Sequence, residues 1–206
     1  MTIKTNQNFL KLLSYLIIFI SYLSLQLGFF YNEDFIGGAK ADFVTYQNWI
    51  NFFLEDFKYY FFNYDQLDER HSPVIIIYFT LLHKLGLSDI IIRYIHLNIA
   101  VLIFFYFYKC LKIKFQNTNT YLIILFSSLI FLSPTLRALA IWPDSRIYGL
   151  AFFVVSIYFY LKFKKENDFN SALYNIFFLS ISSYLSPNFS LFSIFFFFNY
   201  LFHYKI

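Results

Sequence analysis

The chain has 206 residues, of which 59% are hydrophobic and 26% aromatic, and its mean hydropathy is +0.56. The apolar residues form long blocks, which excludes an ordinary soluble domain and the alternating segments of an outer-membrane barrel. The net charge of +4 comes from basic residues scattered at the ends of these blocks, so we predict no nucleic-acid partner. The composition indicates an all-α integral membrane protein.

The first apolar block, Phe9–Phe30, follows Lys4 and Lys11. It is about 20 residues long, enough to cross a bilayer, and no small-x-small cleavage site follows it. We therefore predict an uncleaved first span whose N-terminus lies in the cytoplasm.

Residues 31–89 form the predicted first outer loop. Eight of the twelve acidic residues lie between Tyr31 and Ser72, against only three basic residues. Such a loop either reflects only the orientation of the protein in the membrane or contains an active site. The acids are Glu33, Asp34, Asp42, Glu55, Asp56, Asp65, Asp68 and Glu69.

Within this loop, the range Asp42–Phe62 is predicted to be one amphipathic helix, because aromatic and aliphatic residues recur every three or four positions. An aromatic stripe opposite a polar face suits a helix in the headgroup layer of the membrane. Asp42 has a simple alternative role as the N-cap of this helix. Glu33 and Asp34 have an equally simple interpretation as solvated charges that follow the first span.

After the loop, the apolar blocks predict five more spans, for a bundle of about six. They are Ile90–Tyr108, Tyr121–Leu136, Ile147–Phe163, Leu173–Leu185 and Phe189–Tyr204.

The segment Pro73–Gly86 is apolar but only about 14 residues long, or roughly 21 Å as a helix, against a hydrocarbon core of about 30 Å. If it does not cross the membrane, nine lysines lie inside and ten of the twelve acids lie outside. This distribution follows the positive-inside rule, so we predict that Pro73–Gly86 is interfacial or re-entrant.

The same topology places all four arginines, Arg70, Arg93, Arg137 and Arg146, on the outer side. The planar guanidinium group binds phosphate through two hydrogen bonds, so arginines on this side fit a phosphate-handling site. Snorkelling of arginines at span ends remains the alternative. Asp144 likewise has an alternative role, as the N-cap of the span that follows it.

The order of these features resembles a known family. An outer loop begins Asp42-Phe43-Val44-Thr45-Tyr46, His71-Ser72-Pro73 opens a short helix, and Arg93 stands near the start of the next span. Ser133-Pro134-x-x-Arg137 and then Asp144 follow. Over residues 10–165 the chain resembles the N-terminal part of GT-C glycosyltransferases, in the branch of protein O-mannosyltransferases and aminoarabinose transferases. Phe43 and Ser72 depart from the family pattern, where an acid and a proline are common.

The resemblance implies an inverting transfer of a sugar from a polyprenyl-phosphate donor to a hydroxyl acceptor, on the outer face of a bacterial inner membrane. Asp42 would be the general base, and Asp144 would orient the acceptor or share a divalent metal with Asp34. The need for a metal stays open. Arginines at 93, 137 and 146 would hold the phosphate, and His71 would complete the substrate-binding set.

Family members are usually longer, so we expect either a single transmembrane domain of 1–206 or the N-terminal part of a longer protein. The alternative function is that of a non-catalytic membrane protein, such as a carrier of lipid-linked sugars or an assembly subunit. It would keep the helices and the lipid contacts without needing particular carboxylates. A transporter is disfavoured, because the sequence shows no internal repeat.

Overall fold

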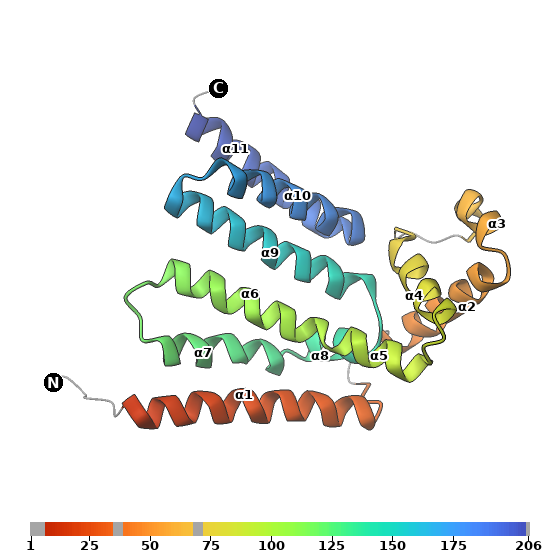
Figure 1. Cartoon of the computed structure of the whole chain (residues 1–206), viewed down its shortest axis with the longest axis horizontal. Helices are drawn as coiled ribbons and strands as arrows, with labels where there is room; N and C mark the ends of the chain where they lie inside the picture. Colours follow the sequence, from red (N-terminus) through yellow and green to blue (C-terminus); the bar gives the residue numbers. More distant parts are fainter. Residues whose placement is uncertain (1–6, 35–38, 68–71, 205–206) are drawn as a thin grey trace.

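The computed structural model describes residues 7–34, 39–67 and 72–204, and in these ranges all regular secondary structure is helical. Long helices lie side by side along the molecule, and a group of shorter helices gathers at one end (Figure 1). This arrangement confirms the all-α prediction.

Three helical stretches are long and apolar enough to cross a membrane. They are α1 (Gln7–Phe30), the stretch Asp89–Lys114 formed by α5 (Asp89–Leu97) and α6 (Ile99–Lys114), and α9 (Ser145–Glu166). Helix α9 packs against α6 on one side and against α10 (Phe169–Leu185) on the other, while α1 packs against α7 (Thr120–Ser128). The core of the bundle lies between these helices.

The predicted span Tyr121–Leu136 is not one straight helix. It is divided into α7 (Thr120–Ser128), a 3-10 turn η2 (Leu129–Leu132) and α8 (Pro134–Ile141), with a bend of 66°. The ring of Pro134 disfavours helical backbone at the residue before it, and Ser133 has φ −66° and ψ 118°. The Ser133 hydroxyl then accepts a hydrogen bond from the Leu136 N–H and caps α8.

The last two predicted spans are helices, but short ones. Helix α10 has 17 residues, and α11 (Phe192–Tyr204) has 13 after the 3-10 turn η3 (Pro187–Leu191). At 1.5 Å per residue they reach about 26 Å and 20 Å, less than a hydrocarbon core of about 30 Å. The described residues thus contain three helices of spanning length, or four with the bent pair, and a count of six stays a prediction.

The predicted helix 42–62 begins earlier and is interrupted. Helix α2 covers Ala39–Glu55 and α3 covers Phe57–Phe62, because the Asp56 carboxylate accepts a hydrogen bond from the Tyr59 N–H and caps a new helix. A 3-10 turn η1 (Tyr64–Leu67) follows.

The apolar stripe of α2 is buried, which confirms the amphipathic pattern. It packs against α4 (Val74–Lys84) and α8. Protein rather than lipid headgroups therefore covers this face. The stripe consists of Phe43, Tyr46, Ile50 and Phe53.

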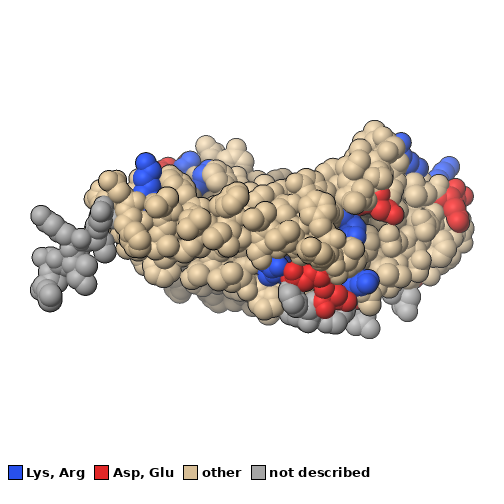
Figure 2. Space-filling view, turned by 90° about the horizontal axis from the view of Figure 1, so that it is seen from below, with Lys and Arg blue, Asp and Glu red and all other residues tan. Residues whose placement is uncertain are grey.

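The two ends of the bundle differ in their elements. The start of α1, the α6–α7 turn and the α9–α10 turn lie at one end, and α2, α3 and α4 lie at the other (Figure 1). Lysines occupy the last turns of α6 and α9. In Figure 2, charged side chains gather towards both ends, and the surface between them carries few of them. Helix α4 does not run alongside the long helices, in keeping with the predicted interfacial position of Pro73–Gly86.

Candidate functional site

Two carboxylates from distant parts of the chain share one arginine. Arg146 Nη2 lies 2.7 Å from Asp42 Oδ2 and 2.5 Å from Asp144 Oδ2, and Arg146 Nε donates to Asp144 Oδ1 at 2.9 Å. Asp144 also caps α9, since its Oδ1 accepts from the Arg146 N–H at 2.7 Å. The capping role predicted for Asp144 is therefore confirmed, and its carboxylate is fully engaged.

Asp42 occupies a different position from the one predicted for a cap. Helix α2 begins three residues earlier, so Asp42 lies in the first turn. A carboxylate there interacts favourably with the positive end of the helix dipole. Its side chain is 49% exposed, whereas that of Asp144 is 3% exposed. Of the two carboxylates, only Asp42 has a face open to an incoming molecule.

Glu33 and Arg137 form a second, largely buried pair. Arg137 Nε and Nη2 donate to the two Glu33 oxygens at 3.0 and 2.7 Å, and Arg137 Nη1 donates to Ser24 Oγ at 3.1 Å. Their side chains are 14% and 12% exposed. The interpretation of Glu33 as a solvated charge is therefore wrong.

The end of α1 aims Glu33 at Arg137. Asn32 adopts left-handed backbone with φ 50°, and the N–H groups of Asn32 and Glu33 return to the carbonyls of Phe29 and Gly28. This is a Schellman C-cap, in which asparagine tolerates the left-handed position. A Cβ at Gly28 would collide with the Glu33 carboxylate, so glycine makes room for the ion pair.

Arg93 is held by aromatic rings and neutral oxygens. Its guanidinium carbon lies 4.1 Å from the centroid of the Trp142 ring, and Nη1 donates to Asn32 Oδ1 at 3.1 Å. Burial lowers the solvation of this group, and its Nε is enclosed without a hydrogen-bond partner in the part of the chain that is described. Across residues 7–34, 39–67 and 72–204, no carboxylate lies within ion-pair distance of Arg93.

Trp142 joins these groups into one polar cluster. Its Nε1 donates to the Glu33 carbonyl at 2.9 Å, its ring packs on Phe43 beside Asp42, and Lys40 Nζ lies 5.3 Å from the ring centroid. Lys40 and Arg93 therefore approach the same indole. We call the following residues the polar cluster: Glu33, Lys40, Asp42, Arg93, Arg137, Trp142, Asp144 and Arg146.

One described residue of the predicted site, Asp34, does not join the cluster. Asp34 is exposed and makes no hydrogen bond or ion pair with another described residue. His71, like Arg70, lies outside the described residues. Within the described ranges, no three side chains among histidine, cysteine, aspartate and glutamate are grouped so as to hold a metal ion.

Sequence reasoning overlooked Lys40 and Trp142 and misjudged Glu33. Trp142 stands next to Pro143-Asp144, so its position beside a predicted site residue was a usable signal. Nothing local marks Glu33, because its partner Arg137 is 104 positions away.

Comparison with known proteins adds no assignment, since no family model, no curated protein and no solved structure matches this chain.

Proposed function

We propose that this chain is a membrane glycosyltransferase that moves a sugar from a polyprenyl-phosphate donor to a hydroxyl acceptor at the polar cluster. The single observation that carries the proposal is that the cluster holds an accessible carboxylate close to two cations. It contains one half-exposed carboxylate, Asp42, and two cations, Lys40 and Arg93, that have no described carboxylate within ion-pair distance. A base and an anion site close together are what this transfer requires.

Asp42 is the general base in this proposal. Its Oδ2 is held by Arg146, which leaves Oδ1 available to take the proton of the acceptor hydroxyl. The acceptor oxygen then forms a bond to the anomeric carbon from the face opposite the phosphate, and the bond from that carbon to the phosphate oxygen breaks. The lipid phosphate leaves with the electron pair. Because the acceptor attacks from the opposite face, the configuration at the anomeric carbon is inverted.

Arg93 and Lys40 hold the phosphate in this proposal. Negative charge grows on the phosphate oxygens as the bond breaks, and preorganised cations stabilise that charge. The guanidinium of Arg93 is fixed against Trp142 before substrate arrives, so little reorganisation is needed.

Arg137 and Asp144 become positioning residues. Both edges of Arg137 are used by Glu33 and Ser24, and Asp144 is committed to Arg146 and to the cap of α9. Neither has a free face for substrate, so they orient Arg146 and the end of α1 instead. Catalysis by a bound metal is not part of the proposal.

The proposal is tested by the substitution Asp42→Asn. Membranes supplied with polyprenyl-phosphate sugar should lose transfer by at least about 100-fold, the usual contribution of a general base, while the protein level stays unchanged. Asp56→Asn is the matched control, because asparagine caps a helix as well as aspartate does and the same charge is removed from an exposed site. Transfer that persists in Asp42→Asn would refute the base assignment.

A second candidate function, a non-catalytic carrier of lipid-linked sugars or an assembly subunit, is favoured by a different observation. Each carboxylate of the cluster is already paired with an arginine, as in a network that only holds helices together. In that case Asp42→Asn lowers the thermal stability of the purified protein and leaves any transfer activity of the membrane unchanged.

A further inference from the structure

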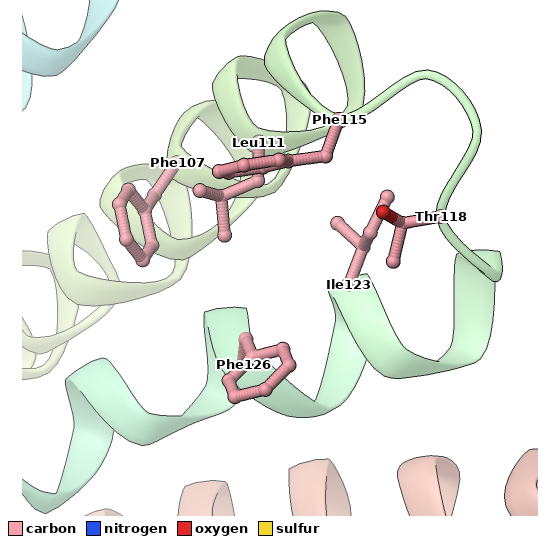
Figure 3. A pocket seen from close by; sticks show the side chains of 6 residues that line it. All are labelled: Phe107, Leu111, Phe115, Thr118, Ile123 and Phe126. Carbon is pink, nitrogen blue, oxygen red and sulfur yellow. The ribbon is translucent and has the colours of Figure 1, made fainter.

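A hollow of about 450 Å³ opens where α6 turns into α7, away from the polar cluster. Apolar side chains from both helices line it, and the Thr118 hydroxyl is the polar group among them (Figure 3). Its volume lies within the range of about 300–1,000 Å³ that is usual for ligand pockets. We call it the α6–α7 pocket, and its lining residues are Phe107, Leu111, Phe115, Thr118, Ile123 and Phe126.

Two exposed lysines in the last turn of α6 adjoin lining residues of this pocket in the sequence. Phe107 and Leu111 face the pocket from α6, and Lys114 follows at the three- and seven-residue spacing that puts it on the same helix face. Lys112 directly follows the lining residue Leu111 and is exposed in the same last turn, with its Nζ 5.8 Å from the centroid of the Tyr108 ring. The apolar hollow therefore lies beside two positive charges at the end of α6, and we call these two lysines its rim.

Nothing in the neighbouring sequence neutralises this rim. The chain has no aspartate or glutamate between residues 90 and 143. Neither lysine forms an ion pair with a described carboxylate, whereas Lys162, at the same end of the bundle, pairs with Glu166. The site is thus complementary to a molecule with an apolar tail and an anionic head.

We propose that the α6–α7 pocket binds one acyl chain of an anionic phospholipid, with the lipid phosphate at Lys112 and Lys114. An acyl chain gains little by leaving a bilayer for an apolar pocket, since both surroundings are hydrocarbon. The pocket therefore fixes where the lipid lies, and the lysines select its charge. Each lysine near an anionic headgroup is worth about a fivefold preference.

Titration of the purified chain with two lipids tests this site. The probes are phosphatidylglycerol and phosphatidylcholine with identical acyl chains, and native mass spectrometry counts the lipid bound. The double variant Lys112→Gln/Lys114→Gln should bind phosphatidylglycerol about 30-fold more weakly and phosphatidylcholine unchanged. Leu111→Trp fills the pocket and should weaken the binding of both lipids.

Two further variants make the outcome decisive. Lys164→Gln/Lys165→Gln removes the same charge from the end of α9 and should leave both affinities unchanged; an equal loss of phosphatidylglycerol binding there would overturn the site in favour of general surface charge. Phe126→Trp adds bulk from a side chain that is 55% exposed, so it fills the pocket without repacking α6. If neither tryptophan variant weakens lipid binding, the pocket does not hold the chain.

Discussion

At the scale of single residues, two buried tyrosines differ in whether the hydroxyl group has a hydrogen-bond partner. Tyr46 donates to Ser145 Oγ at 3.2 Å, whereas the Tyr148 hydroxyl is enclosed and has no hydrogen-bond partner in the described part of the chain. A buried polar group without a partner costs about 1–3 kcal/mol, while a satisfied one contributes about 1 kcal/mol.

Opposite effects are therefore expected from the same chemical change. Tyr148→Phe should leave the free energy of unfolding unchanged or raise it by up to about 1 kcal/mol, and Tyr46→Phe should lower it by about 1 kcal/mol. Thermal unfolding of the purified variants in one detergent measures the difference. A loss of stability in Tyr148→Phe as large as that in Tyr46→Phe would show that the Tyr148 hydroxyl has a partner after all.

The residue scale also shows which site features are readable from sequence. Asp144 caps α9 through a contact two residues away, so its local pattern was enough to predict the cap. The pairing of Asp42 with Arg146 and of Glu33 with Arg137 each spans 104 positions. Such contacts depend on how helices return in space, which single-sequence patterns do not encode.

At the scale of helices, Gly149 lets α9 and α10 approach closely. A Cβ at this position would lie 2.7 Å from Ser186 Cβ, and the Gly149 carbonyl accepts a hydrogen bond from Ser182 Oγ at 2.7 Å. Close approach of backbones at small residues is a common way to join helices in membranes.

Gly149→Ala should therefore lower the stability by about 1–3 kcal/mol, the usual cost of overpacking. The double variant Gly149→Ala/Ser186→Gly removes the clashing Cβ and should recover part of that loss in the same thermal unfolding assay. If the single variant unfolds like the unchanged chain, Gly149 and Ser186 do not approach each other closely.

Helix boundaries were predictable where their signals are local. The breaks at Ser133-Pro134 and at Asp56 follow from proline sterics and from a capping carboxylate, both present in the sequence, although hydropathy alone predicted continuous helices there. The elements that cover the apolar stripe of α2 were not predictable. An apolar helix face indicates that something covers it, but not whether this is lipid, α4 or α8.

At the scale of the whole molecule, the positions of the lysines predict the orientation through the positive-inside rule. The last turns of α6 and α9, with two lysines each, lie at the same end as the start of α1. A topology reporter fused after Ile113 should therefore report a cytoplasmic position. A reporter that is active outside would mean that the bundle has the opposite orientation, with the polar cluster facing the cytoplasm.

The most direct test of the central claim is photolabelling by a polyprenyl phosphate that carries a diazirine on its first isoprene unit, followed by peptide mapping. We expect label on α2, the start of α5 and residues 141–146, with competition by unlabelled polyprenyl phosphate and less label in Arg93→Gln. Label confined to the α6–α7 turn, or label on these segments that unlabelled polyprenyl phosphate does not displace, would show that the polar cluster does not bind a polyprenyl phosphate.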